Sequence, residues 1–141
     1  MIKELLQLVD DDTHAFNEIM AAFSLPKNTP EEKNVRSSAI KVATINAIKI
    51  PFRTMEVAFQ SFELIKAMAE TGNPNSVSDA GVGALCTRTA VKGAYLNVKI
   101  NAQSLENNPE IKQLLEKADE MNRNADILEQ KILESVMSKI K

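Results

Sequence analysis

The sequence predicts an all-α protein, and three observations lead to that fold class. Only four glycines and five prolines occur in 141 residues, too few for an all-β chain with many tight turns. The prolines divide the chain into long proline-free segments. Within those segments, apolar residues recur at three- and four-residue steps, the period of an amphipathic helix. We therefore expect a bundle of about five helices.

The first helix is expected over residues 1–23. Its apolar side chains form a stripe centred near Val9 and Phe16, and Asp12 lies between these two residues inside the stripe. A carboxylate in an apolar face is costly unless it is paired, and burial raises its pKa toward values that suit proton transfer. Asp12 is therefore either a core aspartate bonded to a neighbouring helix or a catalytic group.

Two further helices are expected on either side of Pro51. Thr29 and Pro30 provide an N-cap and a first-turn proline for a helix that reaches Ile50. No turn residues surround Pro51, so we expect a kink or a very short break there rather than a loop. The third helix then ends at Gly72, which suits a left-handed cap.

The fourth helix, about residues 76–101, is expected to be the buried central helix of the bundle. It is apolar nearly all round, with charges confined to a narrow band. Glycine inside a helix costs about 1 kcal/mol relative to alanine. The three glycines of this helix, Gly81, Gly83 and Gly93, therefore indicate the close approach of another helix or of a flat ligand.

Polar residues near this helix are candidates for ligand binding. The start of the helix carries Asn75, Ser78 and Asp79. The ordinary role of such residues is to cap the helix. A polar loop at a helix N-terminus also suits an anionic or heteroaromatic ligand. Farther along one line of the helix lie Gly83 and Asn97. This line is therefore a candidate wall of a binding site.

The last helix is expected from Pro109 to the end of the chain. Its apolar seam runs through Ile111, Leu114, Ala118, Met121, Ala125, Leu128, Ile132 and Val136. Such a helix would span roughly 50 Å, longer than a small domain needs. We therefore expect its end to pack on a second subunit.

Charge and metal chemistry narrow the choice of partners. With 17 Lys and Arg against 19 Asp and Glu, the net charge of −2 excludes a strongly basic surface for nucleic acid or membranes. Arg53 is either solvated or a contact for a polycarboxylate tail. His14 has no second His or Cys at ligand spacing, so we expect no metal site.

A single cysteine, Cys86, and no apolar run of signal or membrane length indicate a cytoplasmic protein.

Five strings, in order along the chain, resemble one family. They are LVDDDTHAFN (8–17), LPKNTPEE (25–32), IPFRTME (50–56), GNPNSVSDA (72–80) and GAYLNVKIN (93–101). The first is similar to the signature "VDxDxxAF". Together they resemble the cyclodeaminase domain of formiminotransferase-cyclodeaminase, a family that also includes methenyltetrahydrofolate cyclohydrolases. The ordered match through the whole chain is more specific than any single motif.

The resemblance implies an all-helical domain that forms a homodimer or higher homo-oligomer and takes a tetrahydrofolate derivative as substrate, without a metal. The proton-transfer carboxylate carries over to Asp12, and Asp79 with its Asn and Ser neighbours matches the family's other polar motif. We therefore expect a folate-dependent ammonia lyase that converts 5-formiminotetrahydrofolate to 5,10-methenyltetrahydrofolate and ammonia.

Two alternatives stay open. One is a methenyltetrahydrofolate cyclohydrolase, in which water opens the methenyl ring and the same carboxylate serves as base. The other is a non-catalytic helical assembly module. Family members carry a helix and a glycine-rich "PGGGS" turn ahead of the signature helix, whereas this chain begins within that helix. We therefore expect residues 1–141 to form one cyclodeaminase-like domain that is incomplete at its N-terminus.

Overall fold

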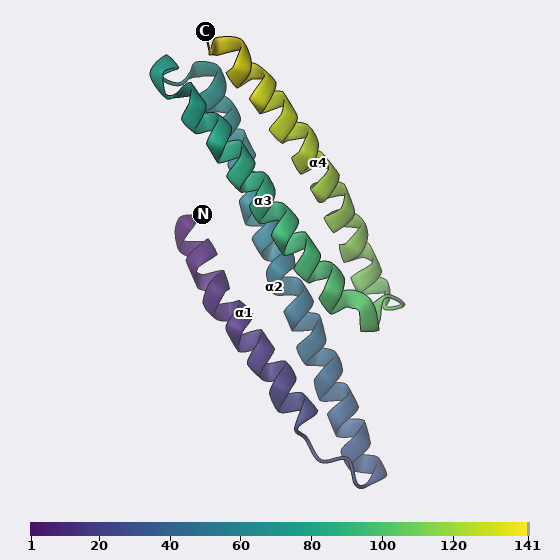
Figure 1. Ribbon diagram of the computed structural model, residues 1–141. Helices are drawn as coiled ribbons and strands as arrows, with labels where there is room; N and C mark the ends of the chain where they lie inside the picture. Colours follow the sequence, from purple (N-terminus) through teal and green to yellow (C-terminus); the bar gives the residue numbers. More distant parts are fainter. Residues whose placement is uncertain (141) are drawn as a thin grey trace.

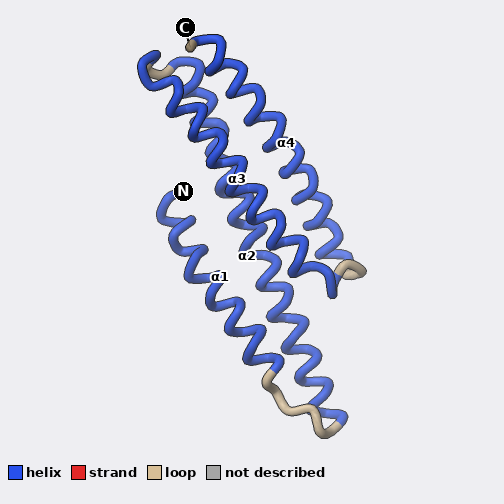
Figure 2. The backbone as a smooth tube through the Cα atoms, in the orientation of Figure 1, coloured by secondary structure: helices blue, strands red, loops and turns tan. Residues whose placement is uncertain are grey.

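The computed structural model describes residues 1–140, and these form an all-α protein (Figure 2). The four long helices are α1 (Ile2–Phe23), α2 (Pro30–Thr71), α3 (Val77–Ala102) and α4 (Pro109–Lys139), with short 3-10 turns η1 (Pro74–Ser76) and η2 (Gln103–Leu105) on either side of α3. Successive helices run in opposite directions (Figure 1). The predicted fold class is confirmed, and the architecture is a four-helix bundle.

The expectation of about five helices is wrong because α2 continues through Pro51. Proline has no N–H, so the carbonyl oxygen of Ala47, four residues earlier, loses its usual helical donor. The side-chain amide of Asn101, on α3, donates to that oxygen at 2.8 Å. Because this bond satisfies a carbonyl in the buried part of the bundle, the helix can continue without a break.

The ends of α2 follow the local chemistry of its sequence. The Thr29 side chain accepts from the backbone N–H of Glu32, whose carboxylate accepts in turn from the N–H groups of Asn28 and Thr29. At the other end, Gly72 is extended, with φ of −73°, so the left-handed cap is wrong. Glycine is needed here for another reason, because a Cβ atom would collide with the carbonyl oxygen of Met68.

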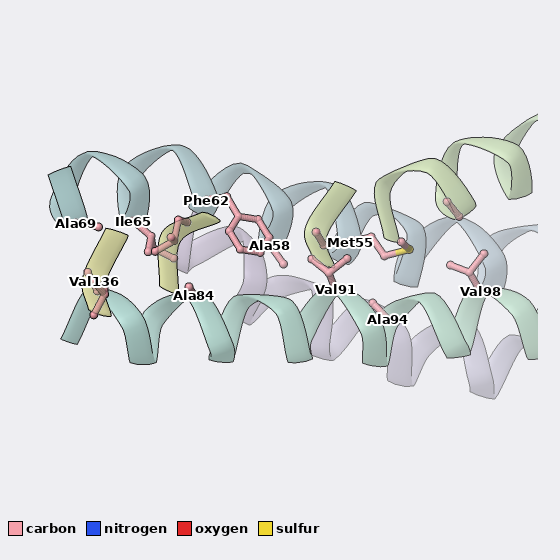
Figure 3. Close-up of a cluster of buried hydrophobic side chains, with 14 of the residues drawn as sticks. Met55, Ala58, Phe62, Ile65, Ala69, Ala84, Val91, Ala94, Val98 and Val136 are labelled. Atoms are coloured by element: carbon pink, nitrogen blue, oxygen red, sulfur yellow. The ribbon is translucent and has the colours of Figure 1, made fainter. Parts of the chain in front are cut away.

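The central part of the molecule is a core shared by α2, α3 and α4. Figure 3 shows Met55, Phe62 and Ile65 of α2 facing Val91 and Val98 of α3. The predicted seam of α4 is confirmed, since it buries Ile111, Ala118, Ala125, Ile132 and Val136. These three helices therefore hold one another in place without side chains from α1.

Helix α1 packs on α2 through a different face from the one predicted. Its buried residues are Leu8, Ala15 and Ala22. The side chains of Val9 and Phe16, the expected centre of the buried stripe, are 65% and 61% exposed. Small residues let the two backbones approach closely, and α2 also presents buried alanines over this stretch. The large apolar residues of α1 are therefore left facing outward.

Helix α3 is buried on one side only, so the expectation of a helix covered nearly all round is wrong. Its other side carries an exposed strip formed by Val82, Leu85, Leu96 and Ile100. Gly81 lies against α4, where a Cβ would come 3.3 Å from the Val136 side chain, whereas Gly93 has nothing within 4 Å. Close helix packing therefore explains Gly81, and Gly93 opens the exposed side to a further approach.

Candidate functional site

A hollow of about 390 Å³ lies where α1, α2 and α3 meet. Helix α1 supplies Asp12 and Thr13, α2 supplies the floor, and α3 supplies the wall opposite α1, with Asn97 in it. The remaining lining residues are Leu5, Leu8, Val9, Pro51, Thr54, Ala90 and Ala94. The structure thus brings together Asp12 and Asn97, two candidates that are 85 residues apart in the sequence.

Asp12 is exposed at the edge of this hollow, so the expectation of a buried aspartate is wrong. The cause is the rotation of α1, which turns Leu8 and Ala15 toward α2 and leaves Asp12 beside the contact. A solvated carboxylate next to apolar walls can accept a proton or a hydrogen bond from a ligand that enters the hollow.

The polar side chains of the hollow differ in whether they are already hydrogen-bonded within the protein. The hydroxyl groups of Thr13 and Thr54 donate to the carbonyl oxygens of Val9 and Ile50 in their own helices, both at 3.2 Å. Within residues 1–140, the side chains of Asp12 and Asn97 make no hydrogen bond to the protein. The Asn97 amide can donate or accept a hydrogen bond, and the Asp12 carboxylate can accept one. A ligand in the hollow can therefore form hydrogen bonds to both side chains.

The floor of the hollow is held by the bond that compensates for Pro51. Asn101 lies one helical turn beyond Asn97 on α3, and its amide donates to the carbonyl oxygen of Ala47 on α2. This bond fixes how far along α2 the α3 wall lies. It therefore sets the position of Asn97 relative to Pro51 and Thr54.

The polar cluster at the start of α3 lies elsewhere. Asn75, Ser78 and Asp79 are exposed, and the backbone N–H of Asn75 donates to the side chain of Asn73 in η1. Eighteen residues separate Asp79 from Asn97, which is about 27 Å along a helix. One chain therefore does not bring this cluster to Asp12, and its role in ligand binding stays a prediction.

Gly83 is half-buried against α2 instead of lining the hollow. A Cβ atom at this position would lie 3.6 Å from the Ile65 side chain, an ordinary van der Waals contact. Gly83 therefore faces α2, where an added methyl group would fit, so close helix packing does not by itself require a glycine here.

Arg53 is engaged in an ion-pair network. Its Nη2 lies 2.7 Å from a carboxylate oxygen of Glu4 on α1, and its Nη1 lies 2.9 Å from Glu56. Hydrogen bonds to Glu56 and Glu4 raise the pKa of the guanidinium. Arg53 thus ties α1 to α2, and a ligand carboxylate would have to compete with Glu4 for it.

The described residues offer few other reactive groups. Cys86 is exposed on α3. Among residues 1–140, no three His, Cys, Asp or Glu side chains are grouped so that they could hold a metal ion. No helix in that range combines the length and the apolar character that crossing a membrane requires.

The sequence patterns do not indicate that α2 contributes to the hollow. Pro51 is predicted only to kink or break the chain, and neither Pro51 nor Thr54 is among the predicted site residues. The signal was nevertheless present, because a proline within a helix frees a carbonyl oxygen that needs another donor. Asn101, one turn beyond the candidate Asn97, is the side chain that provides it.

Comparisons with known proteins identify the family to which the chain is similar. Residues 1–120 match the profile of the formiminotransferase-cyclodeaminase family. The chain is 35% identical to a methenyltetrahydrofolate cyclohydrolase of Methylorubrum extorquens over 138 residues, 98% of this chain and 66% of that protein. It is 37% identical to the formimidoyltransferase-cyclodeaminase of Rattus norvegicus over 102 residues, 72% of this chain and 19% of that protein. The corresponding protein of Dictyostelium discoideum is 35% identical over 123 residues and is covered to 22% of its length.

Proposed function

Because the chain belongs to the formiminotransferase-cyclodeaminase family, we propose that it acts on a tetrahydrofolate derivative and that its reaction is the hydrolysis of 5,10-methenyltetrahydrofolate. The similarity to a cyclohydrolase covers 98% of the chain, whereas the similarity to the rat bifunctional protein covers 72%. The observation that carries the proposal is the position of Asp12, exposed to solvent at the edge of an apolar hollow.

Hydrolysis of the methenyl bridge needs a base. Water adds to the methenyl carbon, one ring C–N bond breaks, and a formyltetrahydrofolate and one proton are formed. A carboxylate can take the proton from the attacking water, and Asp12 is the carboxylate that lines this hollow. Asn97, across the hollow, is suited to a hydrogen bond with a polar edge of the ligand, and the apolar walls suit its ring faces.

The second candidate reaction is the expected ammonia lyase. There, N10 of the folate attacks the formimino carbon, and an acid protonates the departing amine. The identity to the rat formimidoyltransferase-cyclodeaminase favours it, at 37% over 102 residues. That similarity covers 72% of the chain, however, whereas the similarity to the cyclohydrolase covers 98%. The lyase is therefore the weaker of the two candidates.

We also infer that the protein is a homodimer or a higher homo-oligomer in a reducing, cytosolic setting. The exposed strip of α3 and the outward-facing residues of α1 form apolar surface that a second copy can cover. Gly93, with open space around it, allows a partner backbone to approach. A monodisperse species of 15.6 kDa in sedimentation at micromolar concentration would contradict the oligomer.

The test of the reaction is Asp12→Asn, which keeps the side-chain shape and removes the base. Turnover is followed by the loss of methenyl absorbance, with ammonia release from 5-formiminotetrahydrofolate measured in parallel. We expect the hydrolysis rate to fall about 10²- to 10⁴-fold. Asp10→Asn is the matched control, since Asp10 is exposed on the same helix and does not line the hollow.

Each result separates the candidates. Near-normal hydrolysis by Asp12→Asn would remove Asp12 from the mechanism. Ammonia release without hydrolysis by the wild-type protein would establish the lyase instead. Calorimetry that detects no folate binding at all would leave the helical assembly module as the function.

A further inference from the structure

One hydrogen bond between α2 and α3 lies a helical turn away from the candidate site. Within residues 1–140, the bond from the Asn101 amide to the Ala47 carbonyl oxygen, at 2.8 Å, is the only hydrogen bond that joins these two helices. Around it, α2 and α3 meet through apolar side chains (Figure 3). We propose that Asn101 is a positioning residue for the reaction, which acts by placing Asn97 relative to Asp12. This assignment rests on the proposed function.

The bond supplies a constraint that the apolar contacts around it lack. The hydrophobic effect has no direction, so apolar packing alone restrains the sliding of one helix along another only through the shapes of the side chains. The side chains next to the bond are small, since Ala47 and Ala102 are both buried alanines. A single polar contact in an apolar interface can specify the register of two helices, as a buried asparagine does in coiled coils.

The bond and the hollow involve the same faces of the two helices. Asn97 and Asn101 are one turn apart on α3, and Pro51 and Ala47 are one turn apart on α2, which runs in the opposite direction (Figure 1). Asn97 and Pro51 both line the hollow. A shift of α3 along α2 that breaks the Asn101 bond therefore moves Asn97 by the same amount relative to the floor of the hollow.

The position of Asp12 depends on α2 as well. Asp12 is carried by α1, and α1 packs on α2. The other polar contacts of α3 join it to α4, where Tyr95 donates to Asp119 at 2.8 Å and Arg88 Nε lies 2.8 Å from Asp126. The register of α3 on α2 is therefore what relates Asn97 to Asp12, and the bonds to α4 do not fix it.

This register has a consequence for the rate of hydrolysis. The attacking water, the methenyl carbon and the Asp12 carboxylate must be aligned, and a misplacement of about 1 Å can lower a rate by as much as about 10²-fold. A ligand that follows a displaced Asn97 keeps its hydrogen bond to the amide but loses its alignment with Asp12. The loss of Asn101 should therefore lower kcat and leave KM nearly unchanged.

The experiment measures kcat and KM of the full chain for the hydrolysis of 5,10-methenyltetrahydrofolate, well below the melting temperature. Asn101 is half-buried, so in Asn101→Ala water can reach the Ala47 carbonyl oxygen and the fold should survive. We expect kcat to fall about 10-fold, with KM within about 3-fold of the wild-type value. Asn97→Ala should also lower kcat. Adding Asn101→Ala to it should lower kcat by less than a further 2-fold or so, because Asn101 then has no Asn97 to place.

Two further variants keep the test decisive. Asn101→Gln retains an amide donor and with it the fold, but its longer side chain displaces α3, so kcat should fall by more than about 3-fold. Tyr95→Phe is the matched control, since it removes the bond from α3 to Asp119 and does not line the hollow. Its kcat and KM should stay within about 2-fold of the wild-type values. Thermal melts identify the variants that are folded.

The outcomes separate this proposal from the proposed function. A wild-type kcat in a folded Asn101 variant overturns the positioning role and leaves the proposed function standing. A fall in kcat that is equally large with and without the Asn97 amide does the same, because it shows that Asn101 does not act through Asn97. If the wild type turns over neither 5,10-methenyltetrahydrofolate nor 5-formiminotetrahydrofolate, both proposals are wrong.

Discussion

The three-helix part formed by α2, α3 and α4 and the attached helix α1 are built in opposite ways. The first part buries large side chains in one continuous core, whereas α1 contributes none of its residues to that core. Helix α1 is attached through small residues and through the ion pair between Arg53 and Glu4, and its largest apolar side chains face outward.

This difference explains where the hollow lies. A close-packed core leaves no room for a ligand, but the boundary between that core and a helix packed outside it does. Asp12 lies on α1, and Asn97 lies on α3. We therefore expect changes in the core to affect stability and changes at the boundary to affect ligand binding.

The largest effect on stability is expected for Phe62→Ala. The Phe62 side chain is 2% exposed in the core, and removing a buried phenylalanine ring costs about 3–5 kcal/mol. The comparison is Phe16→Ala on α1, which should change the free energy of unfolding of the dissociated chain by no more than about 0.5 kcal/mol. Urea denaturation measures both, at protein concentrations low enough to keep the copies apart. A cost for Phe16→Ala close to that of Phe62→Ala under these conditions would mean that Phe16 is buried within the single chain, and the contrast between the two parts would then fail.

The next effect concerns the bond between the two walls. Asn101→Leu leaves the Ala47 carbonyl oxygen without a donor, which should destabilise the protein by about 1–3 kcal/mol. Pro51→Ala restores an N–H group four residues after Ala47, so Asn101→Leu should cost clearly less in that background. A double-mutant cycle from urea denaturation measures the coupling. Additive costs would show that the Asn101 bond does not replace the helical one.

A smaller, pH-dependent effect is expected at the rim of the three-helix part. Tyr95 donates to Asp119 of α4 at 2.8 Å, and this hydrogen bond, with partial burial, raises the pKa of the phenol above its usual value. The folded protein therefore holds this proton more tightly than the unfolded chain. The contribution to stability is present below about pH 10 and is lost as the pH rises through the folded value. Melting temperatures measured from neutral to alkaline pH should fall less for Tyr95→Phe than for the wild type.

The smallest effect is expected for Arg53→Gln, which removes the exposed ion pair to Glu4. Exposed ion pairs contribute little, so amide exchange in α1 should accelerate by less than about 5-fold, without a change in α3 or α4. High salt should remove the difference from the wild type. Faster exchange throughout the bundle would show that α1 is an integral part of the core.

The sequence predicted the packing of α4 better than that of α1 because the two helices encode packing differently. The seam of α4 is a single apolar line, and the structure buries it as predicted. In α1, apolar residues cover a wide arc, so their pattern alone does not say which edge contacts α2. The small residues Ala15 and Ala22 decided that question, and a count of hydrophobic residues gives them little weight.

The site was predicted in part for the same reason. Asp12 and Asn97 were identified as candidates, but their meeting depends on the rotation of α1 and on the register of α3, which periodicity does not determine. The Asp79 cluster was placed with them because one line of α3 joins both. The two ends of that line are about 27 Å apart along the helix, however, so lying on one face does not bring them to the same site.

The bond from Asn101 to the Ala47 carbonyl has a consequence for how this protein can vary. Either Pro51 and Asn101 are kept together, or both are exchanged, because losing the proline makes the asparagine dispensable and losing the asparagine penalises the proline. Substitutions at these two positions, fifty residues apart in the chain, should therefore be correlated among relatives. Each of these two residues would then limit which substitutions the other can accept during evolution.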